Sequence, residues 1–149
     1  MNDDLIKNLI SLAQLDRDAT SVYDDALKHV TDDDLRMALT DFRDEHEHHI
    51  TQISAGIVRL GGQPLEFKVD MMGHAADWFT TLRSVTGQHG ALEALRTAEK
   101  YHNKRYGEAV TWDVSDSDLR RELGEFFAEE KHHLSYVEGK LSVQAASPS

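Results

Sequence analysis

Residues 31–36 of this chain read TDDDLR, and residues 115–120 read SDSDLR. Each stretch places a hydroxyl residue ahead of acidic residues, a pattern that caps the N-terminus of a helix and complements the positive end of its dipole. The two stretches lie 84 positions apart, and the same offset relates Phe42 to Phe126, His46 to Glu130 and His49 to His133. We therefore expect an internal repeat in which each half contributes an equivalent helix.

The segments that precede the two stretches are also related. An offset of 83 positions pairs Leu12 with Leu95, Asp16 with Glu99, Tyr23 with Tyr106 and Ala26 with Ala109. Apolar residues recur in steps of three and four, which indicates amphipathic helices over residues 5–30, 35–60, 92–112 and 119–141. Two helical hairpins joined by a long crossover predict an all-α four-helix bundle with approximate twofold symmetry.

The remaining segments complete the expected organisation. The second helix should stop at Gly61 and Gly62, which Pro64 follows. Residues 65–85 carry a shorter amphipathic pattern, which predicts a short crossover helix between the second and third helices. The last residues, VQAASPS, offer little to bury. We expect one domain over residues 1–142 and a disordered tail over 143–149.

The composition narrows the classes of function. The chain has 27 acidic and 16 basic residues and a formal net charge of −11, which argues against nucleic acid and anionic membranes as partners. It has no cysteine, so any metal site must use oxygen and imidazole ligands. No run of about 18 apolar residues occurs, and the start, MNDDLIKN, does not resemble a signal peptide. We expect a cytoplasmic protein.

Titratable residues interrupt the apolar seam of every expected long helix. They fall at one level of the bundle: Asp16, His46, His49, Glu99, His102, Glu130 and His133. An ionisable group in a bundle core is costly unless it is paired or coordinated. Three pairs among the seven are spaced by three residues, which brings both side chains of a pair to one face of a helix. Such oxygen and imidazole donors suit iron, manganese or zinc.

The segment EEKHHLSYVEGKL, residues 129–141, resembles the last helix of ferritin-like proteins such as bacterioferritin and rubrerythrin. There a Glu-x-x-His motif supplies iron ligands, and here Glu130 and His133 match it. Asp16 and Glu99, each seven residues before a tyrosine, resemble the single carboxylates of that superfamily's first and third helices. The resemblance covers residues 4–141. It implies an up-down-down-up bundle with a di-iron site whose ligands are Asp16, Glu99, Glu130, His133 and His49.

His46 departs from this resemblance, because it stands where the superfamily has glutamate. Four carboxylates neutralise two divalent ions, whereas three leave one positive charge. Glu45 could supply the missing anion, with His48 as its partner in an alternative ligand pair. His102 stands where its repeat partner is Ala19, so it is a candidate extra ligand. These residues could hold one ion, two ions or a mixed pair.

The resemblance implies a homodimeric di-metal protein that acts on dioxygen or peroxide as an oxidase or peroxidase, or handles iron in oxidative stress. The chain has no cysteine for a rubredoxin-type donor, so turnover would need an external reductant. The rival expectation, which His46 favours, is a non-catalytic ferritin-like module that holds zinc or no metal and binds a partner. The sequence assigns no catalytic residue. For the metal-free protein we expect His46→Leu to raise stability, because it removes a buried polar group.

Overall fold

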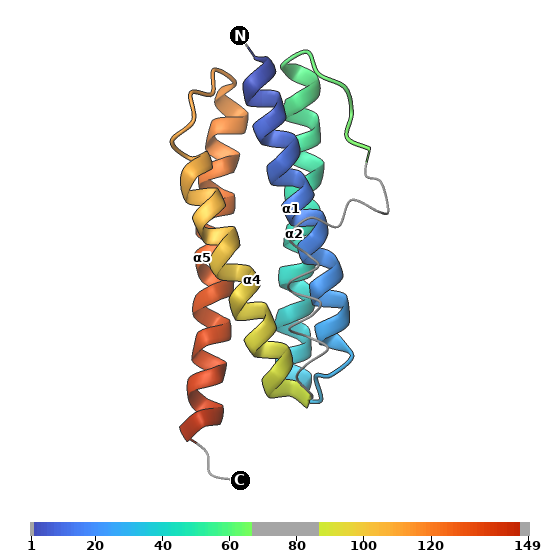
Figure 1. Cartoon of the computed structure of the whole chain (residues 1–149), viewed down its shortest axis with the longest axis vertical. Helices are drawn as coiled ribbons and strands as arrows, with labels where there is room; N and C mark the ends of the chain where they lie inside the picture. Colours follow the sequence, from blue (N-terminus) through green and yellow to red (C-terminus); the bar gives the residue numbers. More distant parts are fainter. Residues whose placement is uncertain (1, 67–86, 147–149) are drawn as a thin grey trace.

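The computed structural model describes residues 2–66 and 87–146, which form a bundle of four long helices. They are α1 (Asp3–Leu27), α2 (Asp33–Arg59), α4 (Gly87–Ala109) and α5 (Ser117–Ala146). In Figure 1, α1 and α5 run in one direction and α2 and α4 in the other. α1 packs against α2 and α4, and α5 packs against α4 and α2. The predicted all-α, up-down-down-up bundle is confirmed.

Aspartates begin the second helix of each hairpin. The Asp32 carboxylate accepts from the backbone N–H groups of Asp34 at 2.9 Å and Leu35 at 3.4 Å. The Asp116 carboxylate accepts from the Leu119 N–H at 2.9 Å. Each cap therefore lies one residue after the hydroxyl that we expected in this role. A carboxylate caps as well as a hydroxyl does, and the Thr31 hydroxyl donates instead to Gln88, at 3.4 Å.

The helix ends agree with the sequence at one position and differ by a few residues at others. Gly61 has a φ of 95°, and the Gly62 N–H donates to the Ile57 carbonyl at 2.9 Å, so the glycine pair ends α2 as expected. α1 and α4 each end three residues earlier than we expected. α5 continues to Ala146, so the first four residues of the predicted tail are helical. The domain limit at residue 142 stays a prediction, and residues 147–149 lie outside the described part, as does nearly all of the predicted crossover helix.

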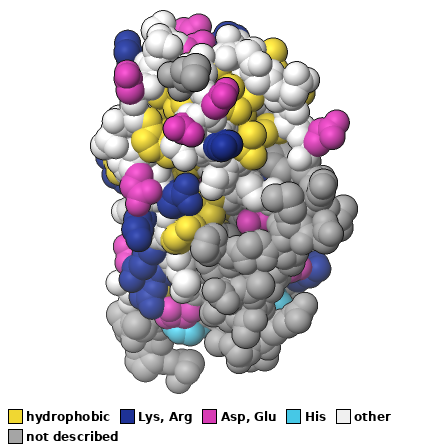
Figure 2. Space-filling view, turned by 45° about the horizontal axis from the view of Figure 1, so that its top comes forward, with side chains coloured by type: hydrophobic (Ala, Val, Ile, Leu, Met, Phe, Trp, Pro, Cys, Tyr) yellow, Lys and Arg dark blue, Asp and Glu magenta, His cyan; other side chains and the backbone are white. Residues whose placement is uncertain are grey.

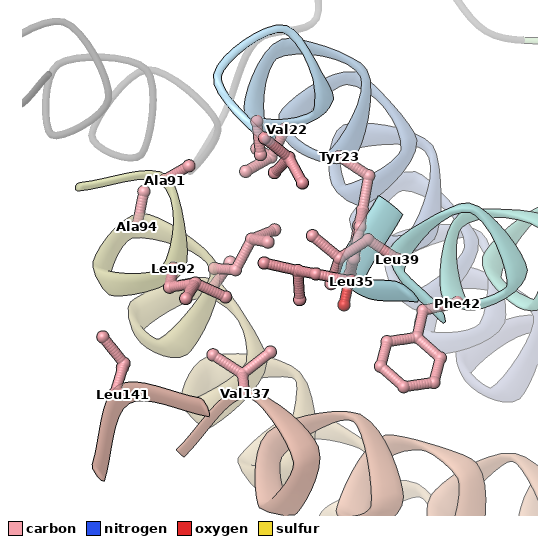
Figure 3. Close-up of a cluster of buried hydrophobic side chains, with 14 of the residues drawn as sticks. Val22, Tyr23, Leu35, Leu39, Phe42, Ala91, Leu92, Ala94, Val137 and Leu141 are labelled. Atoms are coloured by element: carbon pink, nitrogen blue, oxygen red, sulfur yellow. The ribbon is translucent and has the colours of Figure 1, made fainter. Parts of the chain in front are cut away.

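Buried apolar side chains form two clusters, one toward each end of the bundle. The first includes Val22, Leu35, Leu39, Leu92, Leu95 and Val137 (Figure 3). The second includes Leu9, Leu12, Ile53, Ile57, Leu119 and Leu123. Burial of each such side chain stabilises the fold by about 1.5–3 kcal/mol relative to exposure. The bundle is therefore held from both ends, and the buried polar residues form a layer between the two clusters.

The outer surface is charged and mixed. Acidic and basic side chains intermingle over the described part of the face in Figure 2. Arg59 pairs with Asp116 at 2.9 Å and links the end of α2 to the start of α5. None of the helices within residues 2–66 and 87–146 has the length and apolarity needed to cross a bilayer.

Candidate metal centre

The seven titratable residues singled out in the sequence all lie inside the bundle, with no exposed area. Six of them fall into two overlapping groups in which one ligand atom per residue lies within 4.8 Å of the others. The first group is Asp16, His46, His102 and Glu130, and the second is His46, Glu99, Glu130 and His133. The seventh residue, His49, borders the first group, because its Nδ1 lies 3.1 Å from Asp16 Oδ1 and 3.5 Å from Glu130 Oε1. Their assignment as metal ligands stays a prediction.

His46 lies at the centre of this layer. Its Nδ1 is 2.7 Å from Asp16 Oδ1 and 3.3 Å from Glu130 Oε1, and its Nε2 is 3.0 Å from Glu99 Oε1. Burial lowers the pKa of His46, but the charges of Glu130 and Glu99 and the hydrogen bond to Asp16 outweigh burial and raise this pKa to about 9. In the metal-free protein, His46 is therefore an imidazolium that joins the carboxylates of three helices.

His49 and His133 occupy equivalent places on the two halves. His133 Nδ1 faces inward, 3.6 Å from both Glu99 Oε1 and Glu130 Oε2, and its Nε2 lies 2.9 Å from Glu45 Oε2. His49 Nδ1 likewise faces the layer, and its Nε2 lies 3.4 Å from Glu129 Oε2. Phe42 and Phe126, one from each half, lie against these imidazoles, with ring centroids 4.3 Å and 4.1 Å away. Each imidazole thus directs one nitrogen inward and the other toward a carboxylate.

Glu45 and Glu129 are the outer carboxylates of this site. Glu45 reaches His133 on α5 rather than pairing with His48, which is exposed, so the structure does not bring the alternative Glu45–His48 pair together. The hydrogen bond to His133 lowers the pKa of Glu45. Sequence reasoning missed Glu129, although it is the repeat partner of Glu45 at the same 84-residue offset. That offset was the available signal.

Two buried tyrosines hold the carboxylates of α1 and α4. The Tyr23 hydroxyl donates to Glu99 Oε1 at 2.6 Å, and the Tyr106 hydroxyl donates to Asp16 Oδ2. Each tyrosine therefore orients the carboxylate of the opposite half. Burial and the neighbouring carboxylate raise both tyrosine pKa values well above 10, so the hydroxyls remain donors at neutral pH.

His102 breaks the symmetry of the layer, because its repeat partner is Ala19. Its Nδ1 lies 3.8 Å from Glu130 Oε2, and its ring centroid lies 5.1 Å from that of His46. Burial lowers the pKa of His102, against the opposing charges of Glu130 and Glu99. His102 is therefore a neutral imidazole at neutral pH and keeps a nitrogen lone pair.

Three carboxylate oxygens in the layer fit the coordination of a cation. Glu99 Oε2 and both oxygens of Glu130 are buried and accept no hydrogen bond within the described ranges. An unsatisfied buried acceptor costs about 1–3 kcal/mol, and more when it is charged. A metal ion would compensate all three, and the surrounding nitrogen and oxygen donors, without thiolate, suit iron, manganese or zinc. The described residues therefore fit a transition-metal site.

Comparison with protein-family models gives one match. The model described as "Domain of unknown function (DUF2383)" matches residues 4–112, which include α1, α2 and α4. The matched segment contains five of the seven buried titratable residues, and Glu130 and His133 lie beyond it. Neither the curated proteins nor the solved structures contain a match to this chain.

Proposed function

The chain belongs to the family of the domain of unknown function DUF2383, and we propose that it is a ferritin-like protein whose bundle holds a di-metal centre, most simply di-iron. In this proposal the centre acts on dioxygen or peroxide with an external reductant, or handles iron in oxidative stress. A homodimer and a cytoplasmic location remain predictions.

The observation that supports this proposal most strongly is a buried layer of three carboxylates and four imidazoles, in which the carboxylates have no Lys or Arg partner among the described residues. Asp16, Glu99 and Glu130 have no exposed area, and every ion pair they form within the described part of the chain is with a histidine. Ionised carboxylates in a dry core are costly unless cations and hydrogen bonds compensate them. Metal ions balance them and also use the imidazole lone pairs.

The contacts support distinct roles for the ligands. Glu130 and His46 belong to both candidate groups, and Glu130, as the carboxylate of the two, would be the ligand common to two ions. Asp16 and Glu99 would be terminal ligands, oriented by the tyrosine hydroxyls that donate to them. His49 and His133 would each bind through Nδ1, the nitrogen that faces the layer. When bound, iron or manganese would supply the electrons for reduction of dioxygen or peroxide.

The charge of the site bears on how many ions it can hold. Three buried carboxylates leave one positive charge on two divalent ions. Glu45 lies 2.9 Å from His133 Nε2, and Glu129 lies 3.4 Å from His49 Nε2. They bring two further negative charges to the edge of the layer. With these five carboxylates, the negative charge in and beside the layer exceeds the charge of two divalent ions by one. This arithmetic favours a dinuclear centre, although His46 replaces a carboxylate.

The second candidate is a non-catalytic module that holds zinc or no metal. It is favoured by His46, whose two nitrogens lie within hydrogen-bonding distance of Asp16 and Glu99 and so stabilise the layer without an ion. In this case the bundle would present its helices to a partner protein. The two candidates differ in their response to ferrous iron and air.

The test is an anaerobic titration of chelator-treated protein with ferrous iron, followed by exposure to air. The proposal predicts saturation at two equivalents and a near-ultraviolet band that develops on exposure to air. Glu130→Ala should abolish both, whereas Glu138→Ala, an exposed site on the same helix, should leave both unchanged. Stoichiometric zinc binding without reaction in air would support the second candidate, and absence of any metal binding would reject the metal centre.

A further inference from the structure

Glu45 and Glu129 form a symmetric pair on the α2–α5 face. They lie at equivalent positions of the repeat, and each contacts the Nε2 of a histidine on the opposite helix, His133 and His49 respectively. Each contact therefore crosses between the two halves of the bundle. These contacts form only when α2 and α5 pack together, so they do not arise from the charge pattern of either helix alone.

These two carboxylates differ from the inner ones in their access to water. The side chains of Glu45 and Glu129 are 35% and 28% exposed, whereas those of Asp16, Glu99 and Glu130 are at most 1% exposed. Within the described residues, Glu45 and Glu129 are the carboxylates that contact both solvent and the buried imidazoles. They link the surface to the layer.

The inner side of the same histidines faces groups that need a cation. Both oxygens of Glu130 accept no hydrogen bond within the described part, and they lie 3.5 Å from His49 Nδ1 and 3.6 Å from His133 Nδ1. On the α1–α4 side the layer is covered by Tyr23 and Tyr106, which are fully buried. α2 and α5 also share fewer contacts than the other neighbouring helix pairs within the described residues. A continuous series of contacts therefore joins solvent to Glu130 on this face, through Glu45 and His133 and through Glu129 and His49.

We propose that divalent transition-metal ions enter the buried layer across the α2–α5 face, where Glu45 and Glu129 capture them from solvent. This inference rests on the proposed function. The negative carboxylates raise the local concentration of cations at the entrance, and the imidazoles behind them provide the next donors. Glu45 and Glu129 act chiefly on the rate of entry, whereas the inner residues are the ligands that hold the ion.

The experiment measures Co²⁺ binding to chelator-treated protein by stopped-flow absorbance, with the dissociation rate obtained from an EDTA chase. Glu45→Gln/Glu129→Gln removes both charges but keeps an oxygen that can accept from each histidine. An entry role predicts that the association rate falls by about tenfold at low salt. Because the same two charges also lie near the bound ion, the dissociation constant should rise, mainly through the slower association, while the dissociation rate changes by less than about threefold.

The matched control is Asp41→Asn/Glu125→Gln, which removes two charges one helical turn earlier on the same helices. Both residues are exposed and neither contacts the layer, so the association rate should stay within about twofold of wild type. The inference is overturned if the Glu45/Glu129 variant associates at the wild-type rate, or if only its dissociation rate increases, as expected for a ligand. Failure of the wild-type protein to bind Co²⁺ would instead overturn the proposed function itself.

Discussion

His46 is the residue at which the sequence and the structure lead to different expectations. From the sequence, His46 is a buried polar group in place of a carboxylate, and its replacement by leucine should raise the stability of the metal-free protein. In the structure, however, His46 is the positive partner of Asp16 and Glu99, both of which are fully buried. Removing one member of a buried ion pair leaves an uncompensated charge.

We therefore expect His46→Leu to destabilise the metal-free protein by about 3–5 kcal/mol, the range for breaking a buried ion pair. Urea unfolding followed by circular dichroism in the presence of chelator measures this change. His48→Leu, at an exposed position on the same helix, should shift stability by less than about 0.5 kcal/mol. An apo His46→Leu protein as stable as wild type would mean that His46 does not balance the carboxylates.

The same pairs predict a pH dependence for the metal-free protein. The pKa of His46 is raised from 6.5 to about 9 and that of His133 to about 12. Burial lowers both values, and the neighbouring carboxylates more than reverse it. A histidine whose pKa is higher in the folded state stabilises the fold fully below its unfolded pKa, and this stabilisation is lost as pH rises through the folded pKa. The free energy of unfolding should therefore fall between about pH 6.5 and pH 9.

At low pH the carboxylates act in the opposite sense. Histidine partners hold the pKa values of Asp16 and Glu99 below their ordinary values of 3.8 and 4.5, although burial alone would raise them. Their stabilisation is present above the ordinary values and is lost as pH falls below them. Urea unfolding at several pH values should show maximal apo stability at about pH 5–6.5. Stability that is constant or increases from pH 6.5 to pH 9 would contradict these pairings.

The seven buried titratable residues could be identified from sequence because each interrupts an apolar helical seam. Glu129 could not be identified in this way, because it lies off the seam and reaches the site only through the contact of α5 with α2. Glu45 was recognised as a candidate anion of the site, but its contact with His133 on α5 could not be predicted for the same reason. Contacts between helices depend on side-chain direction across an interface, which periodicity along one helix does not contain.

At the scale of the elements, the repeat predicted the four helices and their approximate limits, because steps of three and four residues and the aspartate-rich starts are local signals. The distance between helices is not local. A Cβ at Gly56 of α2 would lie 2.9 Å from Leu119 Cδ1 of α5, whereas a Cβ at Gly124 would meet nothing within 4 Å. Gly56 thus allows the two helices to approach, and Gly124 has no such role.

Alanine substitutions at these glycines test the approach of α2 and α5. Gly124→Ala should raise the free energy of unfolding by up to about 1 kcal/mol, because alanine favours the helix. Gly56→Ala gains the same helix preference but requires Leu119 to move, which costs about 1–3 kcal/mol. Urea unfolding of both variants should rank Gly124→Ala above wild type and Gly56→Ala at or below it. The reverse order would contradict the close packing at Gly56.

For the whole molecule, the four helices establish the architecture, whereas the family match gives the chain a family but no function. The up-down-down-up order could be predicted because two related hairpins need a long crossover, and that order brings residues from four helices to one level. The number of ions could not be predicted from the sequence. The number of ions depends on whether the side chains of His46, Glu45 and Glu129 face the layer. Their directions are set only when the four helices pack together.

The most direct test of this account is the metal content of the protein purified without chelators, measured by elemental analysis beside the Glu130→Ala and His133→Ala variants. We predict one or two equivalents of a transition metal in the wild-type protein and less than a tenth as much in both variants, which should remain helical because the two apolar clusters hold the bundle. A metal-free wild-type protein that also fails to take up added iron, manganese or zinc, or variants that retain the wild-type content, would contradict it.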